Sequence, residues 1–251
     1  MPTRETEVSP NRRYVIVNAD DFGLSRSVNS GVIEAHERGI VTSASLMVER
    51  PAAAEAAAYA RERSELGLGL HTELRAWRVA RVALPRRGAV RSAAVLERRV
   101  STQLRRQLDR FRMLCGRDPS HLDSHQHRHL WEEVRPAFER AADELEVPLR
   151  RVDPRVRFCG DFYGHDGRGR PEPQSITPES LIGLLERLTE GVTEVCCHPG
   201  YVDELDDWYR LEREQEVRAL CDARVREAVA SLDLELCTFD AVRPVLEKLS
   251  T

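Results

Sequence analysis

The sequence has 251 residues, of which 41% are hydrophobic and 32% charged, and its formal net charge is -4. This length suits one α/β domain with a full core. The negative charge gives no basic field for nucleic acid or an anionic membrane, and no apolar run approaches the ~20 residues of a membrane span. We therefore expect a protein that acts on a small molecule and neither binds nucleic acid nor spans a membrane.

The chain begins with a polar stretch that lacks the apolar core of a secretion signal. We expect residues 1–12 to form a flexible polar tail and residues 13–251 to form a single domain. The six cysteines show no CxxC spacing and resemble small buried hydrophobic residues, which favours a reducing, cytoplasmic location.

After the tail, short β-branched runs alternate with amphipathic helical stretches, a pattern typical of parallel βαβ units. The spacing predicts about seven strands. A Gly/Pro-rich loop over 153–176 is long enough to indicate a functional lid. The predicted strands cover 13–18, 40–48, 66–71, 121–127, 149–152, 193–198 and 234–239, and the main predicted helices cover 27–38, 51–63, 92–114, 131–146, 208–230 and one that begins at Thr177.

Polar residues interrupt the strands at a consistent place, which is at or just past their carboxyl ends. In α/β barrels this end of the strands forms the active-site face. A single histidine at a strand end is weak support for a site. Several polar residues that converge on one face are much stronger support. The candidates are Asp20, Asp21, His71, His125 and His198.

Asp20 and Asp21 are adjacent, so in a regular strand their side chains would point to opposite sides. A turn beginning at Phe22 and Gly23 would let both carboxylates reach the mouth of the barrel. One could then bind a metal while the other acts as a base. Capping of the following helix is the alternative interpretation for either residue alone.

The segment HLDSHQHRH, residues 121–129, packs four histidines and an aspartate into nine residues. In an extended chain all five would share one face by period two. One aspartate with two histidines leaves open positions on a metal ion for water and substrate, as catalytic sites require. Asp123 is the candidate to orient a liganding imidazole. A run of surface histidines is the alternative interpretation.

Four motifs occur in order along the chain, namely NADDFGLS, GLGLHTEL, HLDSHQHRH and EVCCHPGY. Together they resemble the YdjC-like family, which includes chito-oligosaccharide deacetylases and hopanoid-associated relatives. The resemblance covers nearly the whole chain. It implies an irregular, deformed TIM-like (β/α) barrel, one divalent metal ion, Mg or Zn, and hydrolysis of the acetamido group of an N-acetylated sugar or glycolipid. It also implies a homodimer.

Residue by residue, the resemblance implies that Asp21, His71 and His125 bind the metal. Asp20 then corresponds to the base that takes a proton from the metal-bound water, and His198 to a second acid/base that serves the departing amine.

Further residues are candidates for orienting the ligands or contacting the substrate: Asp123, His127 and Tyr163. Other aromatic residues that could stack on a sugar ring are Trp77, Phe162 and Tyr201.

Three other functions compete with deacetylation. A phosphoesterase usually needs two metals and a phosphate cradle, and the sequence has no glycine-rich phosphate loop. A glycosidase needs two carboxylates ~5–10 Å apart, which adjacent Asp20 and Asp21 do not readily give. A non-catalytic sugar- or metal-binding barrel would not need the complete set of five polar residues.

Overall fold

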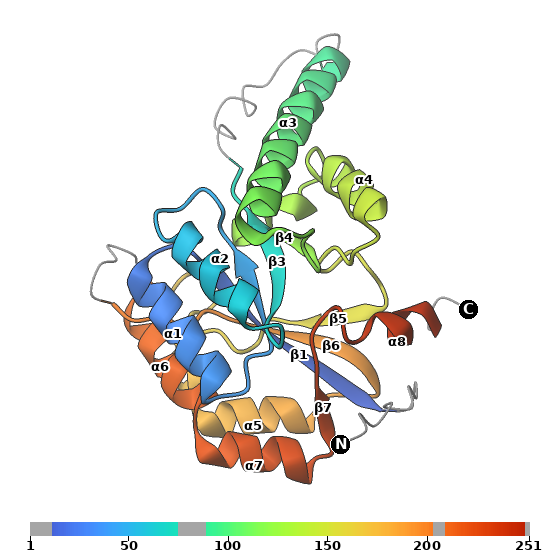
Figure 1. The fold of residues 1–251 in the computed structure, drawn as a ribbon. Coiled ribbons are helices and arrows are strands. Elements are labelled where there is room, and N and C mark those ends of the chain that lie inside the picture. The colour runs from blue at the N-terminus through green and yellow to red at the C-terminus, as the bar shows by residue number, and fades with distance from the viewer. Residues whose placement is uncertain (1–11, 75–88, 203–208, 249–251) are drawn as a thin grey trace.

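The computed structural model describes residues 12–74, 89–202 and 209–248. Within these residues, seven parallel strands form one curled sheet in the order β4-β3-β2-β1-β6-β5, with β7 also paired to β1. Helices cover the outside of the sheet (Figure 1). The sheet is therefore an incomplete, deformed barrel, and the predicted fold and number of strands are confirmed.

The strands are short except for the central one. They are β1 (Arg13–Phe22), β2 (Ser43–Leu46), β3 (Gly67–Thr72), β4 (Leu122–Ser124), β5 (Val156–Cys159), β6 (Gly191–Cys197) and β7 (Leu234–Leu236).

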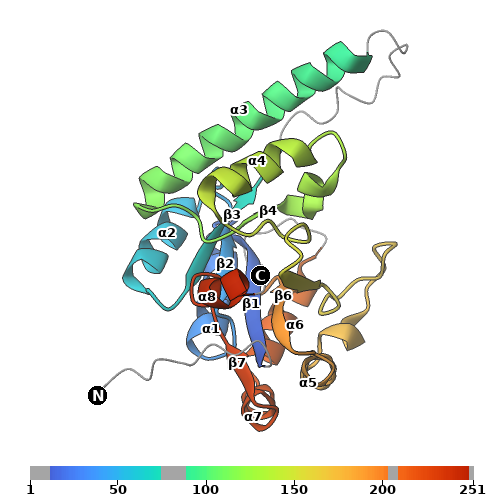
Figure 2. The same cartoon turned by 90° about the vertical axis from the view of Figure 1, so that its right-hand side faces the viewer.

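The α-helices are α1 (Arg26–Glu37), α2 (Ala53–Glu62), α3 (Ala89–Cys115), α4 (Arg135–Leu145), α5 (Pro178–Glu186), α6 (Leu211–Leu220), α7 (Ala223–Ser231) and α8 (Arg243–Lys248). Two short 3-10 helices are η2 (His125–Leu130) and η3 (Pro173–Ile176). The first residues of α3 project beyond the body of the molecule in both views (Figures 1 and 2). Among the described helices, none is both long and apolar enough to cross a bilayer.

β1 divides the barrel interior into an apolar floor and a polar upper half. Its alternate residues Tyr14 and Ile16 pack with Phe239 and other apolar residues of the carboxyl-terminal segment. Two and four positions further on, Asn18 and Asp20 are also buried, and the side-chain amide of Asn18 donates to Asp20. Because side chains on one face of a strand recur every second residue, the same face that closes the floor ends in the polar site.

One edge of β1 is shared by two partners. β7 pairs with the first part of β1, from Arg13 to Val15, and β2 pairs with the part that follows Asn18. β6 pairs along the other edge. β1 is therefore the strand that places Asp20 and Asp21 at the centre of the sheet.

The strand predicted over 149–152 and the helix predicted over 208–230 were both wrong in their limits. The predicted strand over 149–152 forms only an isolated bridge between Leu149 and Leu122, because Arg151 adopts a left-handed φ of 60° that ends the extended run. The strand β5 instead lies inside the predicted lid loop 153–176. The predicted helix over 208–230 is divided into α6 and α7, since Asp222 is extended and its side chain caps α7 at Arg224 N.

The predicted start of a helix at Thr177 is confirmed. Thr177 caps α5 by accepting a hydrogen bond from Ser180 N, with Pro178 in the first turn. Gly116 follows α3 with a φ of 71° and donates to Arg112 O, as a glycine that ends a helix does. Residues 1–11 of the predicted tail and residues 75–88 lie outside the described residues.

Candidate active site

The first strand does not end at Asn18 as predicted but runs through both aspartates to Phe22. Asp21 has a left-handed φ of 65°, and the pairing of β1 with β2 shifts register between Ala19 and Phe22. This irregularity breaks the alternation of side chains. Both carboxylates therefore line one cavity because of a distortion inside the strand, and not because a turn follows it.

The predicted shared face of the histidine-rich segment is wrong. β4 ends at Ser124, and η2 follows, with Gln126 and His127 in the left-handed region at φ values of 58° and 50°. Ser124 Oγ accepts a hydrogen bond of 2.8 Å from His129 N, which bends the chain into this turn. His125, the first residue of η2, consequently reaches Asp21 while His129 is buried beside Ser124.

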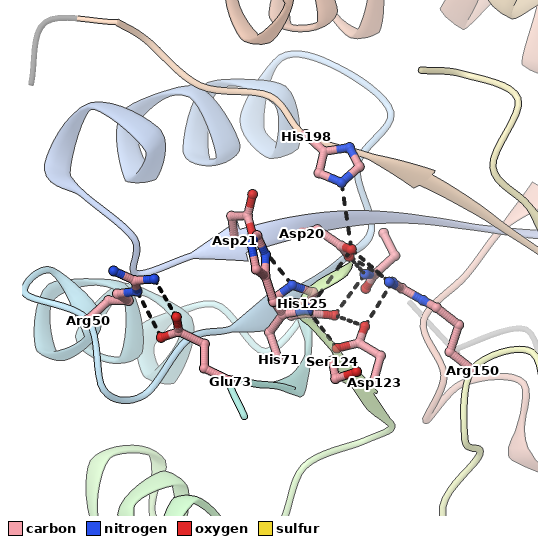
Figure 3. Close-up of polar contacts among 12 residues, drawn as sticks. Asp20, Asp21, Arg50, His71, Glu73, Asp123, Ser124, His125, Arg150 and His198 are labelled. Atoms are coloured by element: carbon pink, nitrogen blue, oxygen red, sulfur yellow. Dashed lines mark hydrogen bonds and ion pairs between the residues drawn. The ribbon is translucent and has the colours of Figure 1, made fainter. Parts of the chain in front are cut away.

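Three predicted ligands meet at the mouth of the barrel. Asp21 Oδ1 lies 3.4 Å from His71 Nε2 and 3.2 Å from His125 Nδ1 (Figure 3). The other carboxylate oxygen, Oδ2, accepts a hydrogen bond of 2.7 Å from Arg213. Burial alone would raise the pKa of Asp21, but Arg213 and the two histidines hold it well below its ordinary value. Asp21 thus presents one charged oxygen to two imidazole nitrogens.

The opposite side of His71 fixes its tautomer. His71 Nδ1 lies 2.7 Å from Asp123 Oδ1, and Asp123 Oδ2 accepts from Ser45 Oγ at 2.7 Å. Burial would lower the pKa of His71, but Asp123 and Asp20 raise it well above its ordinary value. With a metal ion bound, a proton kept on Nδ1 would leave the Nε2 lone pair for the ion, as in other metal-binding histidines. The three ligand atoms lie within 4.8 Å of one another. The donor set of one carboxylate and two imidazoles therefore fits a single divalent metal with open positions.

Arg150 joins the buried carboxylates beneath this site, and sequence reasoning missed it. Its fully buried guanidinium donates to both oxygens of Asp20 at 2.7 Å and lies 2.8 Å from Asp123 and 2.6 Å from Glu194. Burial would raise the pKa of Asp20, but Arg150 and His71 lower it to about 2. Burial outweighs Arg150 at Glu194 and raises its pKa to about 7. The available signal was the pair of arginines, Arg150 and Arg151, inside the strand predicted over 149–152.

His198 follows β6 on the other side of Asp20. Its Nε2 lies 3.8 Å from Asp20 Oδ2 (Figure 3), and its backbone N donates to Glu216 of α6. Burial lowers the pKa of the His198 imidazole to about 4. The Glu216 carboxylate also accepts from Tyr209 OH. The contributions of Arg213, Glu216 and Tyr209 were not predicted, because nothing in the helical pattern distinguishes them from solvent-facing residues.

The five predicted site residues line one cavity of about 570 Å³, namely Asp20, Asp21, His71, His125 and His198. Tyr163 lines it, with its ring stacked on Tyr209 at 4.6 Å between centroids and 5.3 Å from the His198 ring. His127 lines it as well. Of the other aromatic candidates, Phe162 also lines the cavity, although it is 1% exposed and packs into the core. Tyr201 donates its hydroxyl to Glu34, and Trp77 lies outside the described residues.

Comparison with known proteins identifies the family. The model of the family described as YdjC-like protein matches residues 14–231. A carbohydrate deacetylase of Geobacillus stearothermophilus is 38% identical over 90% of this chain and 97% of its own length. A chitooligosaccharide deacetylase of Salmonella paratyphi C is 32% identical over 87% of this chain and 94% of its own length.

Solved structures confirm the fold. An Enterococcus faecalis protein provisionally assigned to cellobiose-phosphate cleavage superposes with a TM-score of 0.73 at 24% identity, covering 92% of this chain and 99% of its own. A family 4 carbohydrate esterase of Streptomyces lividans gives a TM-score of 0.53 at 13% identity, covering 90% and 91%. Given the family match over most of its length and these relatives, the chain belongs to the YdjC-like protein family.

Proposed function

We propose that the protein hydrolyses the acetamido group of an N-acetylated sugar or glycolipid and releases acetate. The observation that carries this proposal is one cavity in which a metal-type donor set, Asp21 with His71 and His125, lies beside two further titratable groups, Asp20 and His198. The relatives named carbohydrate deacetylase support the same reaction class. A divalent ion at the three ligands would supply polarisation of the amide carbonyl and acidification of water.

Asp20 is our candidate for the base. Its Oδ1 accepts hydrogen bonds from Arg150 and Asn18. Its Oδ2 accepts only from Arg150 among the described residues, and this oxygen lies 3.8 Å from His198 Nε2. Arg150 keeps the carboxylate ionised at neutral pH, so Asp20 is able to accept a proton from water at this oxygen. The same ion pair fixes its position, as a positioned base requires.

His198 is our candidate to deliver a proton to the departing amine. With a pKa of about 4 its imidazole is neutral at pH 7. It must therefore first receive the proton that it donates. Its distance of 3.8 Å from Asp20 Oδ2 makes the protonated base the nearest source. Tyr163 and His127 face the same cavity and are candidates to contact the sugar.

The electrostatics of the two aspartates disfavour a glycosidase. Inverting and retaining glycosidases both need one carboxyl group that is protonated near neutral pH. Arg150 lowers the pKa of Asp20 to about 2, and Arg213 holds that of Asp21 well below its usual range. Neither of these aspartates can supply a proton to a glycosidic oxygen. A binding protein without catalysis remains the other function to separate by experiment.

The test is release of acetate from a panel of N-acetylated sugars by protein reconstituted with Mg²⁺ or Zn²⁺. A chelated sample and the His125→Ala variant serve as controls. Metal-dependent acetate from one sugar supports the proposal. Metal demonstrably bound without acetate from any sugar contradicts it and favours a different acyl substrate or a binding role. Two imidazoles with one carboxylate favour zinc over magnesium.

We further propose a cytoplasmic location and a homodimer. The location rests on the six cysteines, which are all free thiols in the structure. The dimer rests on the family resemblance alone. Cell fractionation and light scattering of the purified protein test these two proposals independently of activity.

A further inference from the structure

A second group of potential ligands lies in the same cavity as the metal-type site. Asp20, Cys196 and His198 each offer one ligand atom, and these three atoms lie within 4.8 Å of one another. None of the three belongs to the set of Asp21, His71 and His125. The group is therefore large enough to hold one additional ion beside the first.

The position of Cys196 follows from the alternation of β6. Cys196 pairs in register with Asn18, whose side chain faces the barrel interior, and it lines the cavity. The next residue, Cys197, points the other way, where its thiol contacts Asn18 O and packs with the outer core. Only the first of these adjacent thiols is thus directed at Asp20 and His198.

The donor set is selective for one class of metal. A thiolate with an imidazole suits zinc and other thiophilic ions, whereas Mg²⁺ prefers oxygen ligands. The surroundings also accept positive charge, because the single guanidinium of Arg150 contacts three carboxylates, those of Asp20, Asp123 and Glu194. On binding, the thiol loses its proton to solvent as the sulfur–metal bond forms, with no change of oxidation state.

We propose that Asp20, Cys196 and His198 form a second site that takes a thiophilic divalent ion, Zn²⁺ or Cd²⁺, and that its occupation inhibits the enzyme. The inhibition rests on the proposed function, since the ion occupies the two groups assigned to proton transfer. Binding itself does not rest on it. Turnover then depends on zinc in two ways, since one bound ion supports turnover and a second bound ion suppresses it.

The binding test measures metal stoichiometry by equilibrium dialysis, together with the ultraviolet charge-transfer band of a cadmium–thiolate bond. Wild-type protein should bind two Zn²⁺ per chain and show the band with Cd²⁺. Cys196→Ala and Cys196→Ser should bind one ion and show no band, while the matched control Cys197→Ala should behave as wild type. Equal stoichiometry and equal bands in the Cys196 and wild-type proteins would overturn the proposal.

His125→Ala separates the two sites. This variant should lose the first ion and keep the cadmium band of Cys196. Loss of the band in His125→Ala would mean that Cys196 serves a single shared site, and the proposal would be wrong. Because these readouts do not use activity, they remain decisive even if no sugar yields acetate.

The activity test titrates Zn²⁺ beyond one equivalent. Wild-type turnover should fall, and Cys196→Ala should raise the half-inhibitory Zn²⁺ concentration at least about tenfold, since losing a ligand should cost no less than losing an outer-shell partner. Excess Mg²⁺ should not inhibit. Inhibition by Zn²⁺ that is equal in wild-type and Cys196→Ala protein would contradict the assignment.

Discussion

Arg150 donates two parallel hydrogen bonds of 2.7 Å to the two oxygens of Asp20. The guanidinium is fully buried and the carboxylate nearly so. A planar, bidentate pair fixes both the position and the charge of the carboxylate. The candidate base on β1 is thus held in place by a residue from the segment between α4 and β5.

Removing this cation should destabilise the fold. Arg150→Met leaves three buried carboxylates without a counter-charge, and we expect a loss of about 3–5 kcal/mol in the free energy of unfolding. The matched control is Arg155→Met, which breaks a partly exposed pair with Asp153 and should cost less than about 1 kcal/mol. Urea unfolding monitored by circular dichroism compares the two. Equal losses would mean that the buried pair has no special role in stability.

The two aspartates of β1 should separate metal binding from turnover. Asp20→Asn should retain the ion at Asp21, His71 and His125 and lower turnover by about 10²–10⁴-fold, because it removes the base but none of these three ligands. His125→Ala should lose both the ion held by Asp21, His71 and His125 and turnover. Metal content by atomic emission and acetate release by coupled assay report the two effects. The reverse pattern would show that the roles of ligand and base are assigned wrongly.

Two glycines inside helices should respond in opposite ways to alanine. A Cβ on Gly31 of α1 would lie 2.4 Å from Gly200 Cα, beside the loop that carries His198. We expect Gly31→Ala to destabilise the protein by about 1–3 kcal/mol and to lower turnover. Gly183 of α5 has only Arg187 Nη1 at 3.5 Å, so Gly183→Ala should stabilise by ~0.4–1 kcal/mol.

Thermal unfolding and acetate release measure both glycine variants. Destabilisation of similar size in Gly31→Ala and Gly183→Ala would contradict the close approach of α1 to the His198 loop.

Acid should destabilise the protein through His121. Burial lowers the pKa of this imidazole to about 4, with Arg150 and His71 adding to the effect and Asp123 and Asp20 opposing it. Between pH 6.5 and 4 the unfolded chain therefore binds a proton that the folded chain does not. Stability falls as pH falls through this window, by at most about 1.4 kcal/mol per pH unit for one histidine.

The His121→Gln variant isolates that contribution. It should reduce the slope of unfolding free energy against pH between pH 6.5 and 4, measured by urea titrations at a series of pH values. His36→Gln, on α1 and hydrogen-bonded to Val41 O, is the control. An unchanged slope in His121→Gln would show that this imidazole is protonated in the folded state as readily as in the unfolded one.

The sequence predicted those features that depend on local pattern. Alternating β-branched runs and amphipathic helices predicted parallel βαβ units, and six of the seven predicted strands correspond to observed ones. The family resemblance implied the deformed barrel, and polar residues at strand ends indicated the candidate site. The prediction that residues 121–129 are extended with alternate side chains on one face was wrong. His129 N donates a hydrogen bond to Ser124 Oγ, and this bond stabilises a turn in place of the extended chain. No glycine or asparagine marks the left-handed pair Gln126 and His127, so this turn has no signal in the sequence.

The two arginines that pair with the site aspartates could not be predicted from the sequence. Arg150 comes from the segment between α4 and β5 and Arg213 from α6, and each contacts an aspartate of β1 that is more than 100 positions away in sequence. Such pairs depend on the tertiary packing of distant elements, which periodicity does not encode. Composition does not single out these two arginines either, because the chain has 38 lysines and arginines.

The sharing of one β1 edge by β2 and β7 has a consequence for how the chain folds as it is made. β1 leaves the ribosome first, but its pairing partner β7 lies more than 200 positions later. The first half of β1 therefore keeps an open edge until β7 has been synthesised. Such long-range pairing slows folding and exposes nascent chains to aggregation. Chaperone dependence during translation is accordingly a property expected of this barrel.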